Sequence, residues 1–344
     1  MNLQELSLYL ESRLRDGLMV SGIGWSLMLC FGAAYVCYYL STIAKKPQLV
    51  TGSENFSQFL QDQCPVLTEI YYPTIWCWEG HLQTLLRPFI TSKPNVQYRN
   101  EVITATDGGQ ISLDWFDNHN SIHYPDSSTR PTILLLPGLT GTSKESYILH
   151  MIQQSKTLGY RCVVFNYRGS AGENLLTPRT YCAANTEDLE TIIDYIHKLY
   201  ASAALMAAGI SMGGHRQVFD KLFNMNLVMK AKTIREFDRQ FTTVMFGYPT
   251  IEDYYEDASP CHKLKKIGIP VLCLNSLDDA FSPNHAIPVE IAKQNPNIAL
   301  ILTSYGGHIG FLEGLWPRTC TYMDRIFKQF VQAVFEHGSQ IVTL

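Results

Sequence analysis

Five short apolar runs constrain what most of this chain can fold into, because each is hydrophobic at consecutive rather than alternating positions. They are TILLLPG (132–138), YRCVVFNYRG (160–169), ALMAAGIS (204–211), IPVLCLN (269–275) and IALILTS (298–304). Continuous runs of this length are expected of parallel strands that are buried on both faces. Patterns typical of helices separate most of them, as in residues 143–159 and 185–200. The alternation predicts an α/β fold with a doubly wound, mostly parallel sheet.

The third run leads into a motif that points to catalysis. Residues 209–213 read Gly-Ile-Ser-Met-Gly, which matches the G-x-S-x-G pattern directly after a predicted strand. In such a nucleophile elbow the serine occupies a strained turn between strand and helix, and the flanking glycines relieve the crowding. The alternative reading is a plain glycine-rich turn. We predict that Ser211 is a nucleophile exposed above the edge of the sheet.

A nucleophilic serine needs a histidine base and an acid that orients it, and in this fold the chain order is Ser, Asp or Glu, then His. His308 follows the last apolar run, and Asp278 and Asp279 follow the run before it. All three come at the carboxyl ends of predicted strands, where open α/β sheets place their ligands. Asp279 precedes Ala-Phe-Ser-Pro, which resembles the D-x-x-V-P pattern common after the acid in this fold. We therefore predict Asp279 as the acid, with Asp278 as the alternative.

The oxyanion of an acyl-transfer intermediate needs two backbone N–H groups. One is expected from Met212, which follows the nucleophile. The second is expected from the loop after the first central strand, residues 137–141, where Leu139 is the candidate. An ordinary glycine-rich turn is the alternative reading of that loop.

Composition narrows the function classes further. The net charge is −4 and no long Lys/Arg run occurs, which argues against nucleic-acid binding. The cysteines show no C-x-x-C and no Cys/His spacing typical of a zinc site, so we expect no metal. There is no P-loop and no G-x-G-x-x-G after a strand, so we expect no cofactor.

The N-terminal region has a different character. Residues 17–44 form a run of 28 uncharged residues, long enough to cross a bilayer. A cleaved signal peptide would have a shorter apolar region, and a buried core helix is the other alternative. Two arginines precede the run and two lysines follow it, so the positive-inside rule does not decide the orientation. We predict a transmembrane helix.

Several motifs together resemble the α/β-hydrolase domain-containing protein family, of the AB hydrolase 4 type. They are WCWEGHLQT, PGLTGTSKESYI, FNYRGSAGENLLTPRTY, GISMGG, LNSLDDAFSP and SYGGHIGFLEG, and the similarity covers nearly the whole chain. The resemblance implies a single-pass membrane protein, usually type II, whose Ser/Asp/His triad acts on lipid esters such as phosphatidylcholines. Yeast relatives also transfer acyl groups to alcohols.

The expected organisation follows from these features. A tail (1–16) precedes the transmembrane helix (17–44), and a lead-in rich in proline and aromatic residues (45–100) joins it to an α/β-hydrolase domain (101–340).

The chain departs from the family pattern directly after the elbow. Polar residues from His215 follow where the resemblance implies a small-residue helix, a core strand and lid helices. Ser211 and Asp279 are only 68 positions apart. The resemblance implies a separation well above this, so about 50 to 60 residues are missing relative to the family pattern. Residues 241–248 look strand-like, although the family counterpart is helical. We expect that one core strand and the lid are absent, which leaves unpaired N–H and C=O groups on the two strands beside the gap. Either the sheet re-pairs across the gap, or the chain is unstable or inactive.

Overall fold

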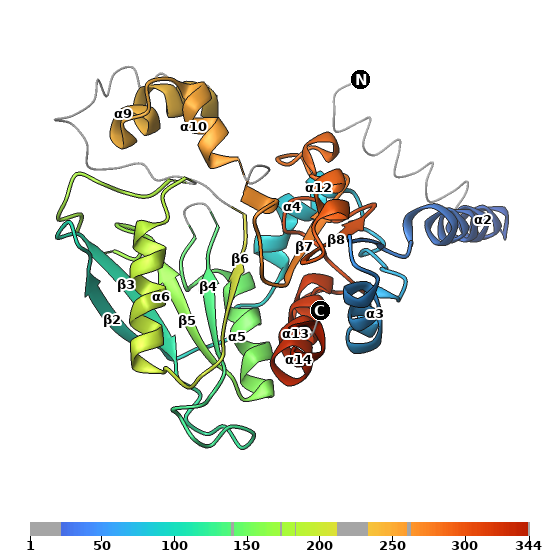
Figure 1. The fold of residues 1–344 in the computed structure, drawn as a ribbon. Helices are drawn as coiled ribbons and strands as arrows, with labels where there is room; N and C mark the ends of the chain where they lie inside the picture. Colours follow the sequence, from blue (N-terminus) through green and yellow to red (C-terminus); the bar gives the residue numbers. More distant parts are fainter. Residues whose placement is uncertain are drawn as a thin grey trace.

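The computed structural model describes residues 22–138, 141–172, 174–182, 184–211, 233–259 and 263–342 (Figure 1). The strands are β1 (Gln48–Val50), β2 (Arg99–Thr104), β3 (Gln110–Phe116), β4 (Thr132–Leu136), β5 (Arg161–Asn166), β6 (Leu205–Gly209), β7 (Val271–Ser276) and β8 (Ile298–Thr303). The helices are α2 (Gly22–Tyr38), α3 (Glu54–Gln63), α4 (Gly80–Ile90), α5 (Ser146–Leu158), α6 (Glu187–Leu199), α8 (Ile234–Phe237), α9 (Thr243–Phe246), α10 (Ile251–Ala258), α12 (Val289–Gln294), α13 (Tyr322–His337) and α14 (Ser339–Val342). Short π or 3₁₀ turns occupy Tyr39–Ile43, Pro65–Leu67, Asp238–Thr242 and Asn284–Ala286.

Five strands form one sheet in the order β2-β3-β5-β4-β6. β2 and β3 make an antiparallel hairpin, and β5, β4 and β6 run parallel to one another. The hairpin turn contains Gly108 at φ +82°, a left-handed conformation that glycine adopts at little cost. The five predicted apolar runs are confirmed as β4 to β8.

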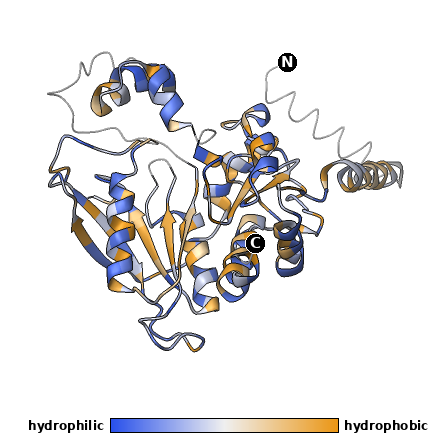
Figure 2. Ribbon diagram, viewed as in Figure 1, coloured by the Kyte–Doolittle hydropathy of each residue, from blue (hydrophilic) through white to orange (hydrophobic). Residues whose placement is uncertain are grey.

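Helices cover both faces of the strands, as expected for a doubly wound fold. α5 and α13 pack in one core against Ile133, Val164 and Ile301, whereas α6 packs on the opposite face against Leu134 and Val163. Burial on both faces explains why β5 and β8 are buried at every position. Figure 2 shows the same pattern, with hydrophobic strands between helices that carry hydrophilic outer faces.

The lead-in belongs to the same fold. Its strand β1 pairs antiparallel with β8, which completes a second sheet in the order β1-β8-β7. Helix α3 contributes Phe56, Phe59 and Leu60 to the core that α5 and α13 share. Residues 45–100 therefore provide structural elements of the sheet and core.

The sheet is divided between β6 and β7. In the described part of the chain, β6 is the last strand of the five-stranded sheet and β7 is the last strand of the three-stranded one. Among the described residues, β6 and β7 do not pair with each other, so the sheet does not re-pair across the gap there. β6 shows the consequence, because Ala207 and Gly209 are exposed although β4 beside it is buried.

The segment after the elbow is helical, as the family resemblance implies, although its residue pattern favours a strand. Residues 241–248 look strand-like because β-branched and aromatic residues favour strands. The structure instead places Asp238–Thr242 and α9 there, both helical. In α9, Thr243 packs inward, and Gly247 ends the helix at φ +73°. The predicted elbow helix from His215 lies outside the described residues.

The N-terminal helix α2 projects from the body of the molecule (Figure 1). Residues Gly24–Ile43 are long and apolar enough to cross a membrane, and little of this stretch is buried against the rest of the protein. The prediction of a membrane anchor is supported to that extent. Residues 1–21, which include the predicted tail and the start of the predicted span, lie outside the described residues.

A buried arginine ties the hairpin to α6. The Arg168 side chain is 2% exposed and pairs with Asp188 through two hydrogen bonds of 2.5 and 2.6 Å and with Asp107 at 2.6 Å. The hydrogen bond from Arg168 lowers the pKa of Asp107 to about 2. Since the carboxylate form is the stabilised one, this pair contributes at neutral pH and weakens only as the pH falls towards 2.

We expect that Arg168→Met lowers the free energy of unfolding by about 3–5 kcal/mol, because two carboxylates lose a buried partner. The matched control is Arg235→Met, since Arg235 is half exposed and forms its ion pair with the exposed Glu252. We expect the control to cost about 1 kcal/mol or less. Denaturant unfolding in detergent measures both variants, and equal losses would contradict the structural role given to Arg168.

Candidate functional site

Ser211 follows β6 in the conformation expected of an elbow. Its φ is +48°, a left-handed value that is strained for a residue other than glycine. The Ile210 N–H donates to the carbonyl of Leu136, so pairing with β4 continues up to the turn. A Cβ at Gly138 would lie 2.9 Å from the Ile210 oxygen and 3.2 Å from the Ser211 Cβ. The loop after β4 therefore lies directly against Ser211.

The structure brings Ser211, His308 and Asp279 together. Ser211 Oγ lies 2.6 Å from His308 Nε2, and His308 Nδ1 lies 2.9 Å from Asp279 Oδ2. Because an ionised carboxylate can only accept, Nδ1 carries the proton and Nε2 is free to accept from the serine hydroxyl. Asp279 Oδ1 accepts from the backbone N–H groups of Phe281 and Ser282 at 2.7 and 3.0 Å. These bonds fix the carboxylate that faces the histidine.

The alternative acid has a different position. Asp278 Oδ1 accepts from the Ser276 hydroxyl at 2.5 Å and from the Gly307 N–H at 2.9 Å. Its carboxylate thus joins the end of β7 to the residue before His308. Of the two adjacent aspartates, Asp279 contacts the imidazole and Asp278 contacts the backbone of the loop that carries it.

Helix α4 also holds the histidine loop, which the motif spacing did not reveal. Thr84 Oγ1 accepts from the His308 N–H at 2.8 Å, and Gln83 Oε1 accepts from the Leu312 N–H at 2.7 Å. A Cβ at Gly307 would lie 2.1 Å from the Gly80 oxygen, so only glycine fits there. The signal was present as the WCWEGHLQT motif, but nothing in the sequence placed this motif beside His308.

The two predicted oxyanion donors, Met212 and Leu139, lie outside the described residues. The neighbouring Gly138 is described, and its N–H donates to the hydroxyl of Tyr147 at 3.1 Å. Burial raises the pKa of Tyr147, which keeps this hydroxyl neutral at physiological pH. The Gly138 N–H is thus already engaged, which leaves the positions beyond it as the candidates in this loop.

We call Ser211, His308 and Asp279 the relay, and this relay is partly open to solvent. The His308 side chain is 23% exposed, and that of Asp279 is 9% exposed. The Phe281 ring lies 5.0 Å from the His308 ring and is itself largely exposed. An apolar side chain beside an accessible histidine is compatible with an apolar substrate.

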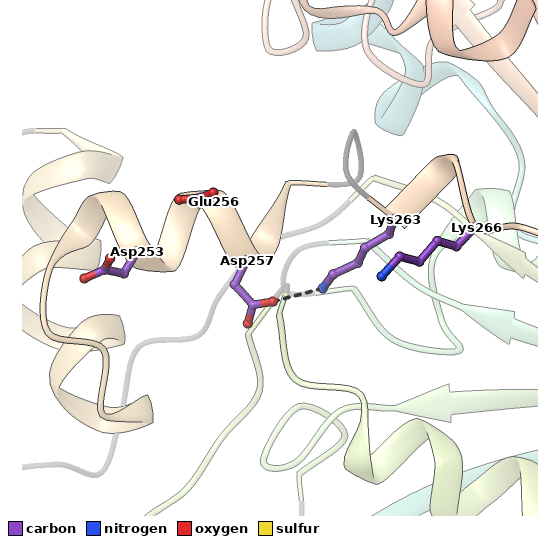
Figure 3. Close-up of a pocket in the computed structure, with 5 residues that line it drawn as sticks. All are labelled: Asp253, Glu256, Asp257, Lys263 and Lys266. Carbon is purple, nitrogen blue, oxygen red and sulfur yellow. Dashed lines mark ion pairs between the residues drawn. The ribbon is translucent and has the colours of Figure 1, made fainter. Parts of the chain in front are cut away.

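A charged pocket lies elsewhere, between α10 and residues 263–266 (Figure 3). It has a volume of about 510 Å³, and Lys263 pairs with Asp257 across it at 3.4 Å. Its lining residues are Asp253, Glu256, Asp257, Lys263 and Lys266. None of the relay residues lines this pocket, and its charged walls do not suit an acyl chain.

The relay has the geometry required for acyl transfer. A hydroxyl within hydrogen-bond reach of a neutral imidazole can attack a carbonyl while the imidazole takes its proton. The carboxylate then stabilises the imidazolium that forms. The three residues come from the ends of β6, β7 and β8, which converge at one edge of the fold.

Comparisons with known proteins show what the whole chain is similar to. The chain is 63% identical to the Homo sapiens protein named Phospholipase ABHD3 over 396 aligned positions, which cover 98% of this chain and 97% of that protein. It is 61% identical to the Bos taurus protein of the same name, with 99% and 97% covered. A solved structure of the Pyrococcus furiosus esterase Pf2001 matches at a TM-score of 0.44 and 17% identity, covering 72% of this chain and 97% of that one. No protein-family model matches the chain.

The length of the alignment supports the expected shortening. It runs over 396 positions, whereas this chain has 344 residues, so at least 52 aligned positions have no residue here. The human protein therefore contains a stretch, or several, that this chain lacks.

The geometry predicts unequal roles for the adjacent aspartates. We expect that Asp279→Asn lowers the turnover of an activated aryl ester by about 10³–10⁴-fold, because an amide no longer fixes the tautomer of His308. Asp278→Asn keeps an acceptor for Ser276 and Gly307, so we expect a loss of about tenfold or less. Equal losses in the two variants, measured with the same ester, would show that this assignment of the acid is wrong.

Proposed function

Because this chain belongs to the α/β-hydrolase domain-containing protein family, we propose that it is a membrane-anchored serine hydrolase that cleaves acyl ester bonds of phospholipids. The observation that carries the proposal is the 2.6 Å contact between Ser211 Oγ and His308 Nε2. The substrate class is argued from the relatives named Phospholipase ABHD3, which match over nearly their whole length. A phosphatidylcholine-type lipid is the substrate that the family resemblance favours.

In the proposed mechanism Ser211 attacks the acyl carbonyl while His308 Nε2 takes the hydroxyl proton. The tetrahedral intermediate collapses to an acyl-enzyme, and His308 returns the proton to the departing lysophospholipid alcohol. Water then attacks the acyl-enzyme in the same way and releases the fatty acid. Asp279 orients His308 and stabilises its charged form.

We assign the oxyanion to the backbone N–H groups of Met212 and Leu139. Support comes from the position of their neighbours, since Gly138 packs against Ser211. Two donors directed at the developing charge are worth several kcal/mol of transition-state stabilisation in enzymes of this type.

The membrane anchor brings this chemistry to its substrate. Gly24–Ile43 is the proposed span, and the resemblance favours a type II arrangement in which the catalytic domain follows the anchor. A lipid hydrolase tethered in this way meets its substrate at the membrane surface.

Two alternatives have specific support. A catalytically impaired form that binds lipid or regulates a longer counterpart is favoured by the divided sheet and by the 396-position alignment. Acyl transfer to alcohols shares the same acyl-enzyme and differs only in the nucleophile that resolves it. Acyl transfer gives esters of the added alcohol, whereas hydrolysis gives free fatty acid. The absence of phospholipid turnover would indicate the catalytically impaired form.

We expect the purified full chain, in mixed micelles with phosphatidylcholine, to release fatty acid and lysophosphatidylcholine. Ser211→Ala should lower the rate by at least about 10³-fold, because the acyl-enzyme cannot form. Adding ethanol tests transfer, since ethyl esters would appear in place of part of the acid. A protein with a cooperative thermal transition but no release, or with release unaffected by Ser211→Ala, would contradict the proposal.

A further inference from the structure

The N-terminal helix is fastened to the catalytic domain along its side. The Tyr39 hydroxyl donates to the Pro73 carbonyl at 2.5 Å, and the Tyr35 hydroxyl donates to the Ile75 carbonyl at 2.5 Å. The Trp78 indole N–H in turn donates to the Tyr35 hydroxyl at 3.1 Å. Residues 73–78 therefore run alongside the last turns of the helix, so the domain does not begin at a flexible joint below it.

These contacts fix how deep residues 73–78 lie relative to a membrane that the helix crosses. Tyr35 precedes Ile43, the end of the candidate span, by eight residues, which corresponds to about 12 Å at the helical rise of 1.5 Å per residue. A span of 20 residues is about as long as the hydrocarbon core is thick. When the helix crosses a bilayer, residues 73–78 must therefore lie at the level of the headgroups or deeper, towards the hydrocarbon core.

An exposed aromatic surface lies on this same part of the molecule. It consists of Tyr72, Trp76, Leu315 and Trp316, which are 43%, 41%, 73% and 66% exposed, and we name it the tryptophan patch. The Trp76 indole N–H donates to the Leu315 carbonyl at 2.7 Å, and the two indole rings lie 5.6 Å apart. A β-bridge between Pro73 and Glu313 joins the two segments that form the patch.

The chemistry of the patch suits one environment in particular. Indole rings with a polar N–H and a large apolar body concentrate at the boundary between headgroups and acyl chains. Lys45 and Lys46 are exposed directly after the helix, where their ammonium groups can meet lipid phosphates. Clustered exposed apolar side chains in a soluble region mark a contact surface, whereas scattered ones do not.

We propose that the tryptophan patch is a second membrane-contact surface, which rests in the interfacial layer of the bilayer that the N-terminal helix spans. The inference rests on the membrane anchoring in the proposed function and is independent of the catalytic assignment. Two attachment points fix the orientation of the catalytic domain, whereas a single helix would leave it free to rotate. The same chain segment continues into α4, whose Thr84 holds His308, so the relay is kept at a set position relative to the lipid.

The test is fluorescence quenching by phosphatidylcholines that carry bromine at defined depths, with the full chain reconstituted in vesicles. The chain has five tryptophans, and Trp25→Phe removes the one within the proposed span. In that background we expect the shallowest brominated lipid to quench most strongly. Adding Trp76→Phe and Trp316→Phe should then remove at least half of the quenchable emission.

The matched control is a tryptophan placed on an exposed apolar site away from the patch. Ile122, in the loop between β3 and β4, is 91% exposed, so Ile122→Trp should add emission that brominated lipids do not quench. No quenching in the Trp25→Phe background, or a loss of less than half of the quenchable emission after Trp76 and Trp316 are replaced, would overturn the proposal. If a second copy or another protein covered the tryptophan patch instead of lipid, brominated lipids would not quench the emission in the Trp25→Phe background. Loss of ester turnover would not change the quenching by brominated lipids. The proposed hydrolase activity and the proposed membrane contact can therefore fail independently.

Discussion

The contact between Ser211 and His308 joins the two sheets of the molecule, and the rest of the proposed chemistry depends on it. Ser211 follows the last strand of the five-stranded sheet, whereas His308 and Asp279 follow strands of the three-stranded sheet. In the described residues no backbone ladder connects β6 to β7. The relative position of the two sheets must therefore come from side-chain packing beneath them.

That packing is concentrated where α4, α5 and α13 meet. One core contains Ile133 and Val164 from the larger sheet and Ile301 from the smaller one, covered by α5 and α13. The buried His150 of α5 faces Asp324 of α13 at 3.3 Å. Thr91, which follows α4, donates to the Ser146 hydroxyl of α5 at 3.0 Å. Since α4 also holds the His308 loop, the helices can keep the relay assembled where strand pairing does not.

Much of this arrangement follows from sequence pattern, for physical reasons. Strands buried on both faces are apolar at consecutive rather than alternating positions, so β4 and β5 could be located directly. The order of Ser211, Asp279 and His308 reflects which strand ends meet at one edge of an α/β sheet. The sequence also indicated that a core strand is absent after β6, and in the described residues β6 and β7 lie in separate sheets.

Other features depend on contacts that pattern does not encode. The Ala-Phe-Ser-Pro pattern favoured Asp279 over Asp278, but it did not reveal the backbone N–H groups of residues 281 and 282 that hold the Asp279 carboxylate. The support of His308 by Thr84 joins residues 224 positions apart. Residues 241–248 have strand propensity, but residues 241–246 lie in helical segments, because propensity is weaker than tertiary context. The tryptophan patch likewise combines two distant segments.

The most direct test of the account is covalent labelling of Ser211 by a fluorophosphonate, followed by intact mass and peptide mapping. The same purified protein should be followed in parallel through its thermal transition. We expect one adduct per chain on Ser211, which is lost in His308→Ala while the thermal transition remains. A protein that melts cooperatively but stays unlabelled at Ser211 would show that the relay is not assembled as an active nucleophile, and the central claim would be wrong.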